Sequence, residues 1–457
     1  MELRDSLSTM GFVLPSTTSY VVYKSSSTIK SKKYNKRNYS SVSRVQVGGS
    51  KISSWSSNRL LFQGKEINTT RKTTTKYWII TVSSQTALEE FVNCSGAKGV
   101  HESAGISRSK SKVLRNKGIE RPVIIGVAAD SGCGKSTFLR RVNEIFGTKV
   151  SQSHTPQGEL VTVICLDDFH TLDRKGRAEK KVTALNPEAN NFELMYQQIA
   201  ALKEGYDIMK PIYNHQTGLI DPPELIQPNH IIVIEGLHPW YDARMKQLLD
   251  FTVYLDISDE VKVAWKIQRD MAERGHKLEN ILASIESRKP DFQQYIDPQK
   301  KDAVAVIQVL PTRLIPDDTE KKVLRVRLIQ REGIQGFQSV YLYDEGSTID
   351  WIPCGRKLTC SYPGIKFHYG PDNWYNHDVS VLEVDGNFEK LEELIYIESH
   401  LNNTSTKFYG EITQQLLRNS SAPGSNNGTG LFQVLTALKM RQLYEELTGK
   451  SIAPVLV

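Results

Sequence analysis

The segment PVIIGVAADSGCGKSTF, residues 122–138, decides the fold. Its apolar, β-branched run at 123–127 predicts a buried strand, and the residues after Gly134 predict the start of a helix. Gly132 and Gly134 between them let backbone N–H groups turn inward around a phosphate, and the helix N-terminus adds its positive dipole end. Ala129 replaces the first glycine of the pattern G-x-x-x-x-G-K-[ST], but the strand before the loop and the helix after it are the required context.

This loop predicts a nucleotide site that takes ATP and Mg²⁺. Lys135 can reach the β- and γ-phosphates, and the Ser136 hydroxyl is placed to bind Mg²⁺. The predicted ATP-binding residues are Asp130, Ser131, Gly132, Cys133, Gly134, Lys135, Ser136 and Thr137.

Composition narrows the class of protein. The chain has 457 residues, 24% of them charged, and a net charge of +7. Lys and Arg accumulate before Gly118 and the remainder is near balance, which argues against a nucleic-acid partner. No apolar run approaches the ~20 residues of a membrane-spanning helix, so we expect no membrane partner. The five cysteines suit neither a disulfide framework nor a zinc site.

The N-terminal region is rich in Ser, Thr and basic residues, and it has no acidic residue between Asp5 and Glu66. Such a bias is typical of an organelle transit peptide, for plastid or mitochondrion, with a disordered basic tail as the alternative. We therefore predict a transit peptide and poorly ordered extension over 1–118, a P-loop catalytic domain over 119–310, and a C-terminal part over 311–457. The predicted fold is α/β, a mostly parallel P-loop NTPase-like sheet flanked by helices, with a β-rich C-terminal extension and terminal helices.

Carboxylates stand at the ends of two further predicted strands. The strand over Val161–Leu166 leads into Asp167 and Asp168, and the strand over His230–Gly236 contains Glu235 near its end. Ligands bind at this edge of open α/β sheets. Side chains alternate along a strand, so one aspartate of the pair should face the nucleotide. Asp167 is the candidate base for an acceptor hydroxyl, and Glu235 is the expected partner of Mg²⁺ beside Ser136.

Cationic and aromatic residues downstream could form a socket for a phosphorylated acceptor. The segment 210–215 looks like a substrate-side loop, and a helix predicted over 259–274 carries basic groups on one face and ends in a potential lid. For each residue an ordinary surface or ion-pair role is the alternative. The candidates are His170, Arg174, Tyr213, His215, Lys266, Arg269, Asp270, Arg274 and Arg288.

Five ordered motifs together resemble the phosphoribulokinases of chloroplast type. They are AADSGCGKST (128–137), CLDDFH (165–170), PIYNH (211–215), EGLHP (235–239) and WKIQRD (265–270), and the similarity continues through WIPCGRKLTC (351–360) to Leu447. The resemblance implies transfer of the γ-phosphate of ATP to the C1 hydroxyl of D-ribulose 5-phosphate. It implies that Asp167 is the catalytic base, that Glu235 is the metal-associated carboxylate and that the socket residues contact the sugar phosphate.

The resemblance also gives a role to the cysteines. It implies a thioredoxin-controlled disulfide between Cys133 and Cys165, and a second regulatory pair, Cys354 and Cys360. It further implies a homodimer, assembly with glyceraldehyde-3-phosphate dehydrogenase through a small disordered linker protein, and a place in the chloroplast stroma. Two rival functions are a uridine- or pantothenate-type kinase on the same fold, whose acceptor has no phosphate, and a non-catalytic redox scaffold.

Overall fold

The computed structural model describes residues 121–454 except Ser131 and the segments 148–154, 156–157, 159, 273–276, 317, 319–320 and 356. Before residue 121 it describes only strands, so most of the predicted transit peptide lies outside the described residues. These strands form an antiparallel sheet, β1-β2-β6-β5, and a short β3-β4 pair. Their bounds are Thr9–Phe12 (β1), Ser19–Ser26 (β2), Gln46–Val47 (β3), Ser50–Lys51 (β4), Leu60–Asn68 (β5) and Thr74–Val82 (β6).

Contacts divide the chain into Met1–Val113 and Leu114–Val457, and the second unit contains the predicted nucleotide loop. Its main sheet has nine strands in the order β16-β17-β18-β14-β13-β12-β7-β11-β8. The strands are β7 (Val123–Ala129), β8 (Val161–Cys165), β11 (Ile231–Gly236), β12 (Phe251–Ile257), β13 (Ala305–Pro311), β14 (Leu324–Arg331), β16 (Ile349–Trp351), β17 (Ile365–Trp374) and β18 (His377–Gly386). The five strands from β8 to β13 are parallel and the other pairings are antiparallel. The predicted α/β class with a β-rich extension is confirmed, and the sheet continues across residue 310 without a break.

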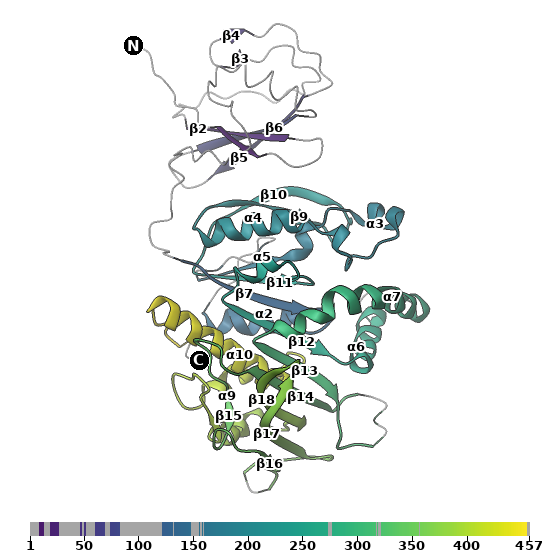
Figure 1. Cartoon of the computed structure of the whole chain (residues 1–457), viewed down its shortest axis with the longest axis vertical. Helices are drawn as coiled ribbons and strands as arrows, with labels where there is room; N and C mark the ends of the chain where they lie inside the picture. The colour runs from purple at the N-terminus through teal and green to yellow at the C-terminus, as the bar shows by residue number, and fades with distance from the viewer. Residues whose placement is uncertain are drawn as a thin grey trace. The chain divides into compact units, whose positions relative to one another are not determined.

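Helices cover both faces of the parallel strands (Figure 1). They are α2 (Lys135–Ile145), α3 (Arg174–Lys180), α4 (Phe192–Lys203), α5 (Ala243–Lys246), α6 (Asp259–Ala272), α7 (Leu278–Asp291), α8 (Leu394–Glu398), α9 (Glu411–Arg418) and α10 (Gly428–Thr448). Short helical turns are η1 (Leu166–Phe169), η2 (Pro187–Ala189), η3 (Phe292–Ile296), η4 (Asp297–Asp302) and η5 (Leu391–Glu393). Within the described residues no helix combines the length and the apolar character needed to cross a bilayer.

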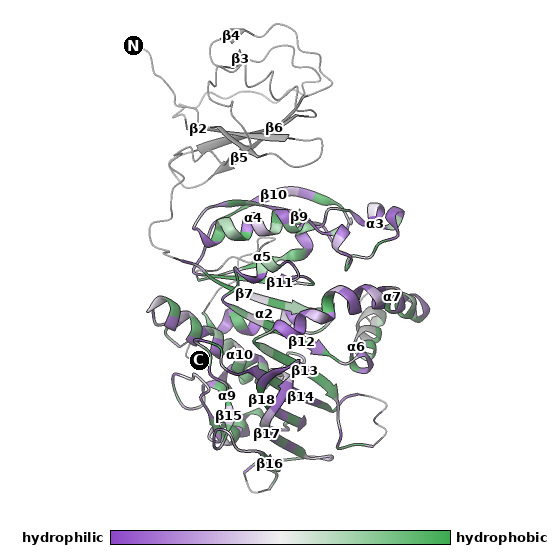
Figure 2. Ribbon diagram, viewed as in Figure 1, coloured by the Kyte–Doolittle hydropathy of each residue, from purple (hydrophilic) through white to green (hydrophobic). Residues whose placement is uncertain are grey.

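Alternation along β7 explains the layers. Ile125 and Val127 pack in one cluster with Phe138 of α2 and with Phe432 of α10, whereas Ile124 packs in a second cluster with Met195 of α4. A strand buried on both faces is apolar throughout, as the β7 sequence is. Figure 2 shows hydrophobic residues along the central strands and hydrophilic ones along α7. The β7 strand is therefore fixed from both sides, and its carboxyl end delivers the nucleotide loop.

One segment differs from the expected loop. Residues 210–213 belong to β9 (Ile208–Tyr213), which pairs with β10 (Ile220–Ile226), so the predicted loop at 210–215 is wrong except for its last two residues. Asp168 accepts a hydrogen bond from the Tyr213 N–H, which anchors the strand.

The long β17-β18 hairpin begins between Gly346 and Gly370, where turn residues are frequent. Its turn at Tyr375 and Asn376 has positive φ angles at residues other than glycine. A further small pair joins β15 (Tyr341–Leu342) to β19 (Leu401–Asn402).

We predict that α10 is part of the central core although it lies at the far end of the sequence. Phe432→Ala should lower the free energy of unfolding by about 3–5 kcal/mol, because it removes a fully buried aromatic ring and leaves a cavity. Urea unfolding measures this loss. Leu447→Ala on the same helix is the control, because that side chain is 52% exposed. Equal losses in the two variants would contradict a core position for α10.

Candidate active site

The loop between β7 and α2 has the backbone that a phosphate cradle needs. Gly132 and Gly134 have φ angles of 88° and 77°, in the left-handed region that favours glycine. Helix α2 begins at Lys135, directly after Gly134, so its N-terminal N–H groups point toward the loop. Ser136 is exposed and Thr137 is half-buried in the first turn of this helix. The described part of the predicted ATP-binding segment therefore forms one continuous turn into a helix; Ser131 lies outside the described residues.

Lys135 interacts with the carboxylates of Glu235 and Asp167 at the edge of the sheet. Its Nζ lies 2.5 Å from Oε2 of Glu235, which is supplied by the neighbouring strand β11. Burial alone would lower the pKa of Lys135, but the charges of Glu235 and Asp167 outweigh it and raise this pKa. Lys135 is therefore a cation at any physiological pH.

Asp167 and Asp168 have different surroundings. The predicted strand ends at Cys165, so both aspartates lie on the helical turn η1 and not on a strand, which corrects the alternation argument. The Asp168 side chain is 3% exposed and binds Nζ of Lys210 at 2.5 Å and the Tyr213 N–H at 2.8 Å. The Asp167 side chain is 27% exposed, and its Oδ2 lies 3.9 Å from Nε2 of His215.

Electrostatics keep Asp167 ionised. Burial would raise the pKa of its carboxyl, but the charges of Lys135, His170, His215 and Arg288, in that order, lower it below the ordinary value. An ionised carboxylate with room beside it can accept a proton from a hydroxyl group. Of the two aspartates, Asp167 therefore has the surroundings of a base and Asp168 those of a structural anchor.

Four of the predicted acceptor residues contact one another in a group that reaches Asp167 through His170 and His215. His170 is buried and its Nδ1 lies 3.0 Å from Oδ1 of Asn190; burial lowers its pKa against the charge of Asp167. The Tyr213 ring packs edge-on against both His170 and His215, with centroid distances of 5.0 Å and 5.1 Å. Arg174 donates a hydrogen bond of 2.9 Å from Nη2 to the carbonyl oxygen of His215. The structure thus brings this predicted group together from η1, α3 and β9.

Arg288 is on the nucleotide side of the site. Its Nη2 lies 3.1 Å from Oδ1 of Asp130 in the loop, and Nζ of Lys262 lies 3.5 Å from the other carboxylate oxygen. Lys266, Arg269 and Asp270 lie on α6, but their side chains are outside the described residues, as is the whole of Arg274. Their predicted contacts with the acceptor therefore remain predictions.

A cavity of about 680 Å³ with both apolar and polar lining lies beside the nucleotide loop. It is bounded by α6, α7 and the carboxyl ends of β12 and β13, and a volume of this size is typical of small-molecule sites. The charged and polar residues that line it include Asp130, Asp256, Lys262, Arg288, Lys300 and Gln308. Through Asp130 it is continuous with the loop that follows β7.

Three residues of this site were not predicted from the sequence. Arg177 donates a hydrogen bond of 2.8 Å from Nη2 to the Tyr213 hydroxyl, and its guanidinium lies 5.3 Å from the centre of that ring. Lys262 reaches Asp130, and Lys210 reaches Asp168. The one available signal was Lys210, a charged residue in alternation with apolar ones along Ile208–Tyr213. The partners of Arg177 and Lys262 are distant in sequence, so no local sequence pattern indicates these contacts.

Cys133 and Cys165 are free thiols in this structure. Cys133 is buried, and burial raises its pKa to about 12; burial also raises the pKa of Cys165 well above the ordinary value. Strand β11 lies between β8, which ends at Cys165, and β7, which leads to Cys133. A bond between the two sulfur atoms therefore requires the loop or the strand end to move.

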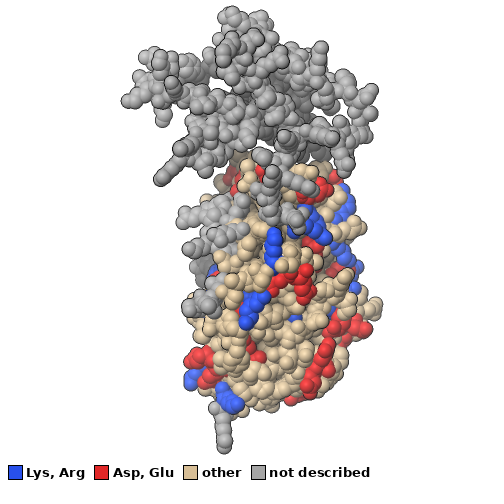
Figure 3. Space-filling model, turned by 90° about the vertical axis from the view of Figure 1, so that its left-hand side faces the viewer, with Lys and Arg blue, Asp and Glu red and all other residues tan. Residues whose placement is uncertain are grey.

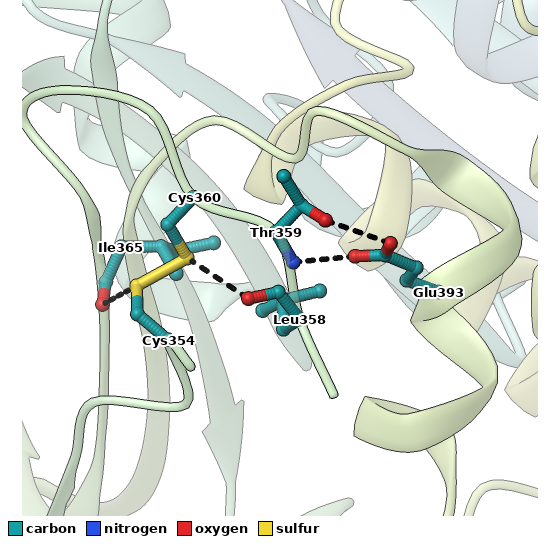
Figure 4. The surroundings of a disulfide bond; sticks show 6 residues. All are labelled: Cys354, Leu358, Thr359, Cys360, Ile365 and Glu393. Atoms are coloured by element: carbon teal, nitrogen blue, oxygen red, sulfur yellow. Dashed lines mark hydrogen bonds between the residues drawn. A yellow bond between two sulfur atoms is a disulfide. The ribbon is translucent and has the colours of Figure 1, made fainter. Parts of the chain in front are cut away.

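Cys354 and Cys360 are joined by a disulfide, with their Cα atoms 5.6 Å apart (Figure 4). Hydrogen bonds attach the loop that they close to the helical turn η5. The backbone N–H and the hydroxyl of Thr359 donate hydrogen bonds of 2.5 Å and 2.8 Å to the two carboxylate oxygens of Glu393. The pair lies on the loop between β16 and β17. These two strands are outside the parallel part of the sheet.

Charges of both signs alternate on the face seen in Figure 3, where blue and red groups lie next to one another on a mostly uncharged surface. Ion pairs such as Arg244 with Glu193 and Asp242 are examples of this mixing among the described residues. Opposite charges this close cancel one another at a distance.

A phosphate-binding loop, a parallel sheet and converging carboxylates define a P-loop kinase. The sequence model of the phosphoribulokinase / uridine kinase family matches residues 124–316. A chloroplastic phosphoribulokinase of Triticum aestivum is 66% identical over 339 residues, which are 73% of this chain and 84% of that protein. One of Chlamydomonas reinhardtii is 63% identical over 356 residues, 76% of this chain and 95% of that protein.

Similarity to a uridine kinase of Limosilactobacillus reuteri is lower and shorter, 29% over 196 residues, which are 41% of this chain and 84% of that protein. The phosphoribulokinase matches extend well beyond that common part. The chain therefore belongs to the phosphoribulokinase family, and the resemblance predicted from its motifs is confirmed.

We predict that Arg288 helps to keep Asp167 ionised. Arg288→Gln should raise the pKa of Asp167, because a cation that favours the ionised carboxylate is removed. A ¹³C NMR titration of Asp-labelled protein measures this pKa, with the Asp167 signal assigned by its loss in Asp167→Asn. Arg288→Lys keeps the charge and is the matched control. A titration curve that is unchanged in Arg288→Gln would contradict the prediction.

Proposed function

We propose that this chain transfers the γ-phosphoryl group of ATP to the C1 hydroxyl of D-ribulose 5-phosphate, giving ribulose 1,5-bisphosphate in the Calvin cycle. Membership of the phosphoribulokinase family, over 84% to 95% of the length of the relatives described, supports this assignment. The single observation that carries the mechanism is the position of Asp167, partly exposed beside Lys135 and His215 while its neighbour Asp168 is fully engaged.

Each group in the proposed mechanism has a simple task. Asp167 accepts the proton of the attacking hydroxyl, and Lys135 neutralises charge on the phosphates. His170, Tyr213 and His215 orient the sugar. Arg174, Lys266, Arg269, Arg274 and Arg288 supply positive charge to its phosphate and to the transferring group, and Asp270 is a further contact of the acceptor. Phosphoryl transfer depends mainly on such positioning and charge neutralisation. All of these groups belong to the proposed catalytic part, residues 119–310.

The residues present suit a Mg²⁺ ion bound with ATP. Mg²⁺ takes oxygen ligands and commonly uses one or two protein groups, with phosphates and water completing its shell. The exposed hydroxyl of Ser136 and the carboxylate of Glu235 are such groups. In this structure Lys135 forms an ion pair with Glu235. Bound phosphates would attract Lys135, and a carboxylate oxygen of Glu235 would then be free to bind the ion. When bound, the ion would withdraw charge from the β- and γ-phosphates.

The cavity beside Asp130 is the proposed place for the nucleoside part of ATP. It adjoins the loop, and its polar lining offers hydrogen-bond partners to a base and a ribose. Lys262 and Arg288 border both the cavity and Asp130, which suits groups that would meet the phosphates between them.

The rival functions fit less well. A uridine- or pantothenate-type kinase needs no cationic socket, and similarity to the L. reuteri uridine kinase covers 41% of this chain against 73% for the wheat phosphoribulokinase. A non-catalytic redox scaffold has no need for an Asp167 that the charges of Lys135 and His215 keep ionised.

Regulation and location follow from the same family. We propose that oxidation of Cys133 and Cys165 switches off activity, with thioredoxin as the reductant, and that the pair Cys354–Cys360 has a second regulatory role in assembly. The proposed location is the chloroplast stroma, after removal of a transit peptide within residues 1–118, in keeping with the chloroplastic relatives. A homodimer and an assembly with glyceraldehyde-3-phosphate dehydrogenase through a small disordered linker protein stay predictions from the resemblance.

The function is tested by one substrate panel. Purified protein with ATP and Mg²⁺ should phosphorylate ribulose 5-phosphate in preference to uridine and pantothenate in a coupled assay, with dithiothreitol present. Asp167→Asn should lower kcat by about 10²–10⁴-fold, because the base that accepts the hydroxyl proton is lost, while ATP binding measured by calorimetry is retained. An active Asp167→Asn variant would contradict the role of Asp167, and preference for uridine or pantothenate would contradict the proposed substrate.

The redox proposal predicts a difference between the two cysteine pairs. Cys133→Ser should abolish inactivation by oxidised thioredoxin, because the bond that would displace the phosphate loop can no longer form. Cys360→Ser is the matched control and should still be inactivated, since it leaves Cys133 and Cys165 intact. Activity before and after oxidation, and after dithiothreitol, measures the effect. A Cys133→Ser variant that is still silenced by oxidation would overturn the proposal.

A further inference from the structure

A buried charge pair lies directly behind the candidate base. Lys210 has no exposed surface, and its Nζ lies 2.5 Å from Oδ2 of Asp168 and 3.3 Å from Oε1 of Glu224. The second oxygen of Asp168 accepts the Tyr213 N–H at 2.8 Å. Nζ of Lys210 also donates to the carbonyl oxygen of Pro211 at 3.0 Å. Asp168 and Lys210 therefore join η1, which carries Asp167, to β9, which carries Tyr213 and leads to His215.

Stability alone gives little reason for this pair. Removing two charges from water is costly, and well-packed apolar residues often serve a core equally well or better. The pair instead fixes geometry, because two short contacts from the Asp168 carboxylate set both the distance and the orientation of β9 against η1. It therefore positions the strand that carries the acceptor residues.

The β9-β10 hairpin needs such an attachment. It is a separate two-stranded sheet, and a lone hairpin is only marginally stable in water. Buried Ile208 and Ile226 hold its far end, where Gln198 of α4 also donates to the carbonyl oxygen of Met209. In the middle of β9, Lys210 lies opposite Glu224 in the hairpin register and reaches across to Asp168, and at the end near the site the Tyr213 N–H donates to the same carboxylate.

We propose that Asp168 and Lys210 are positioning residues that set the acceptor side of the site against Asp167, and that they determine acceptor affinity and turnover but not ATP affinity. This inference rests on the proposed function. The nucleotide loop comes from β7 and α2, and none of the described contacts of Lys210 reaches it. A displaced β9 would therefore move Tyr213 and His215 away from Asp167 while the ATP site stays in place.

The experiment compares three variants with wild type on ribulose 5-phosphate and ATP. Asp168→Asn and Lys210→Met should each lower kcat/KM for ribulose 5-phosphate by about 100-fold, as expected for a misplacement of about 1 Å, with KM for ATP changed less than about twofold. The double variant Asp168→Asn/Lys210→Met leaves no unpaired charge between these two positions. It should regain the melting temperature that the single variants lose, and it should keep their low kcat/KM.

The matched control is a second buried pair of the same chemistry, Glu411 with Arg441, at 2.5 Å and with side chains 0% and 1% exposed. Glu411→Gln should lower the melting temperature as Asp168→Asn does and leave both KM values unchanged. A stable double variant with wild-type kcat/KM for ribulose 5-phosphate, or with KM for ATP raised in parallel, would overturn the inference. Wild-type protein without activity on ribulose 5-phosphate would instead refute the proposed function.

Discussion

Lys135 pairs with one carboxylate and acts electrostatically on a second, and the site depends on that arrangement. Its Nζ lies 2.5 Å from Glu235 at the end of β11, and its charge also interacts with Asp167 on the turn that follows β8. The lysine lowers the pKa of Asp167 against the burial of that carboxyl. Three segments distant in sequence can meet in this way because β7, β11 and β8 are adjacent and parallel, so their carboxyl ends share one edge. The sheet thus assembles the charges, and the charges set the protonation state of the base.

Much of this could be predicted from the sequence because the signals are local. A buried parallel strand is apolar throughout, so β7, β11 and β12 stand out, and a polar residue at the end of such a strand must face the edge of the sheet. Glu235 was predicted in this way, and Lys135 was predicted from the phosphate-loop pattern. Asp167 was predicted as the base, but the local sequence does not show what engages Asp168, because that depends on Lys210, which lies 42 residues away and reaches Asp168 from another strand. Likewise, the β17-β18 hairpin turns at Tyr375 and Asn376, and no glycine marks its position.

The last helix shows a further limit of sequence reasoning. Helix α10 was predicted as a terminal helix of the C-terminal part, residues 311–457, and no local signal showed that it packs against α2 in the main core. Arg141 of α2 is buried and donates hydrogen bonds to Gln433 at 3.0 Å and to Ser425 at 2.7 Å, partners 292 and 284 residues away. A buried guanidinium without such partners would be strongly destabilising. A β-carbon placed on Gly134 would lie 3.7 Å from the amide nitrogen of Gln433, so the same side chain also borders the phosphate loop. The end of the chain therefore supports the loop that follows its first core strand.

The two cysteine pairs differ because their positions in the fold differ. Cys354 and Cys360 lie on one surface loop with Cα atoms 5.6 Å apart, within the range of a disulfide, and bonding them needs no change in the sheet. Cys133 belongs to the phosphate loop, its side chain is packed in the core, and this burial raises its pKa to about 12. Disulfide exchange uses the thiolate, so this thiol reacts slowly for as long as the loop is packed. A disulfide from Cys133 therefore requires the packing around the phosphate loop to change first.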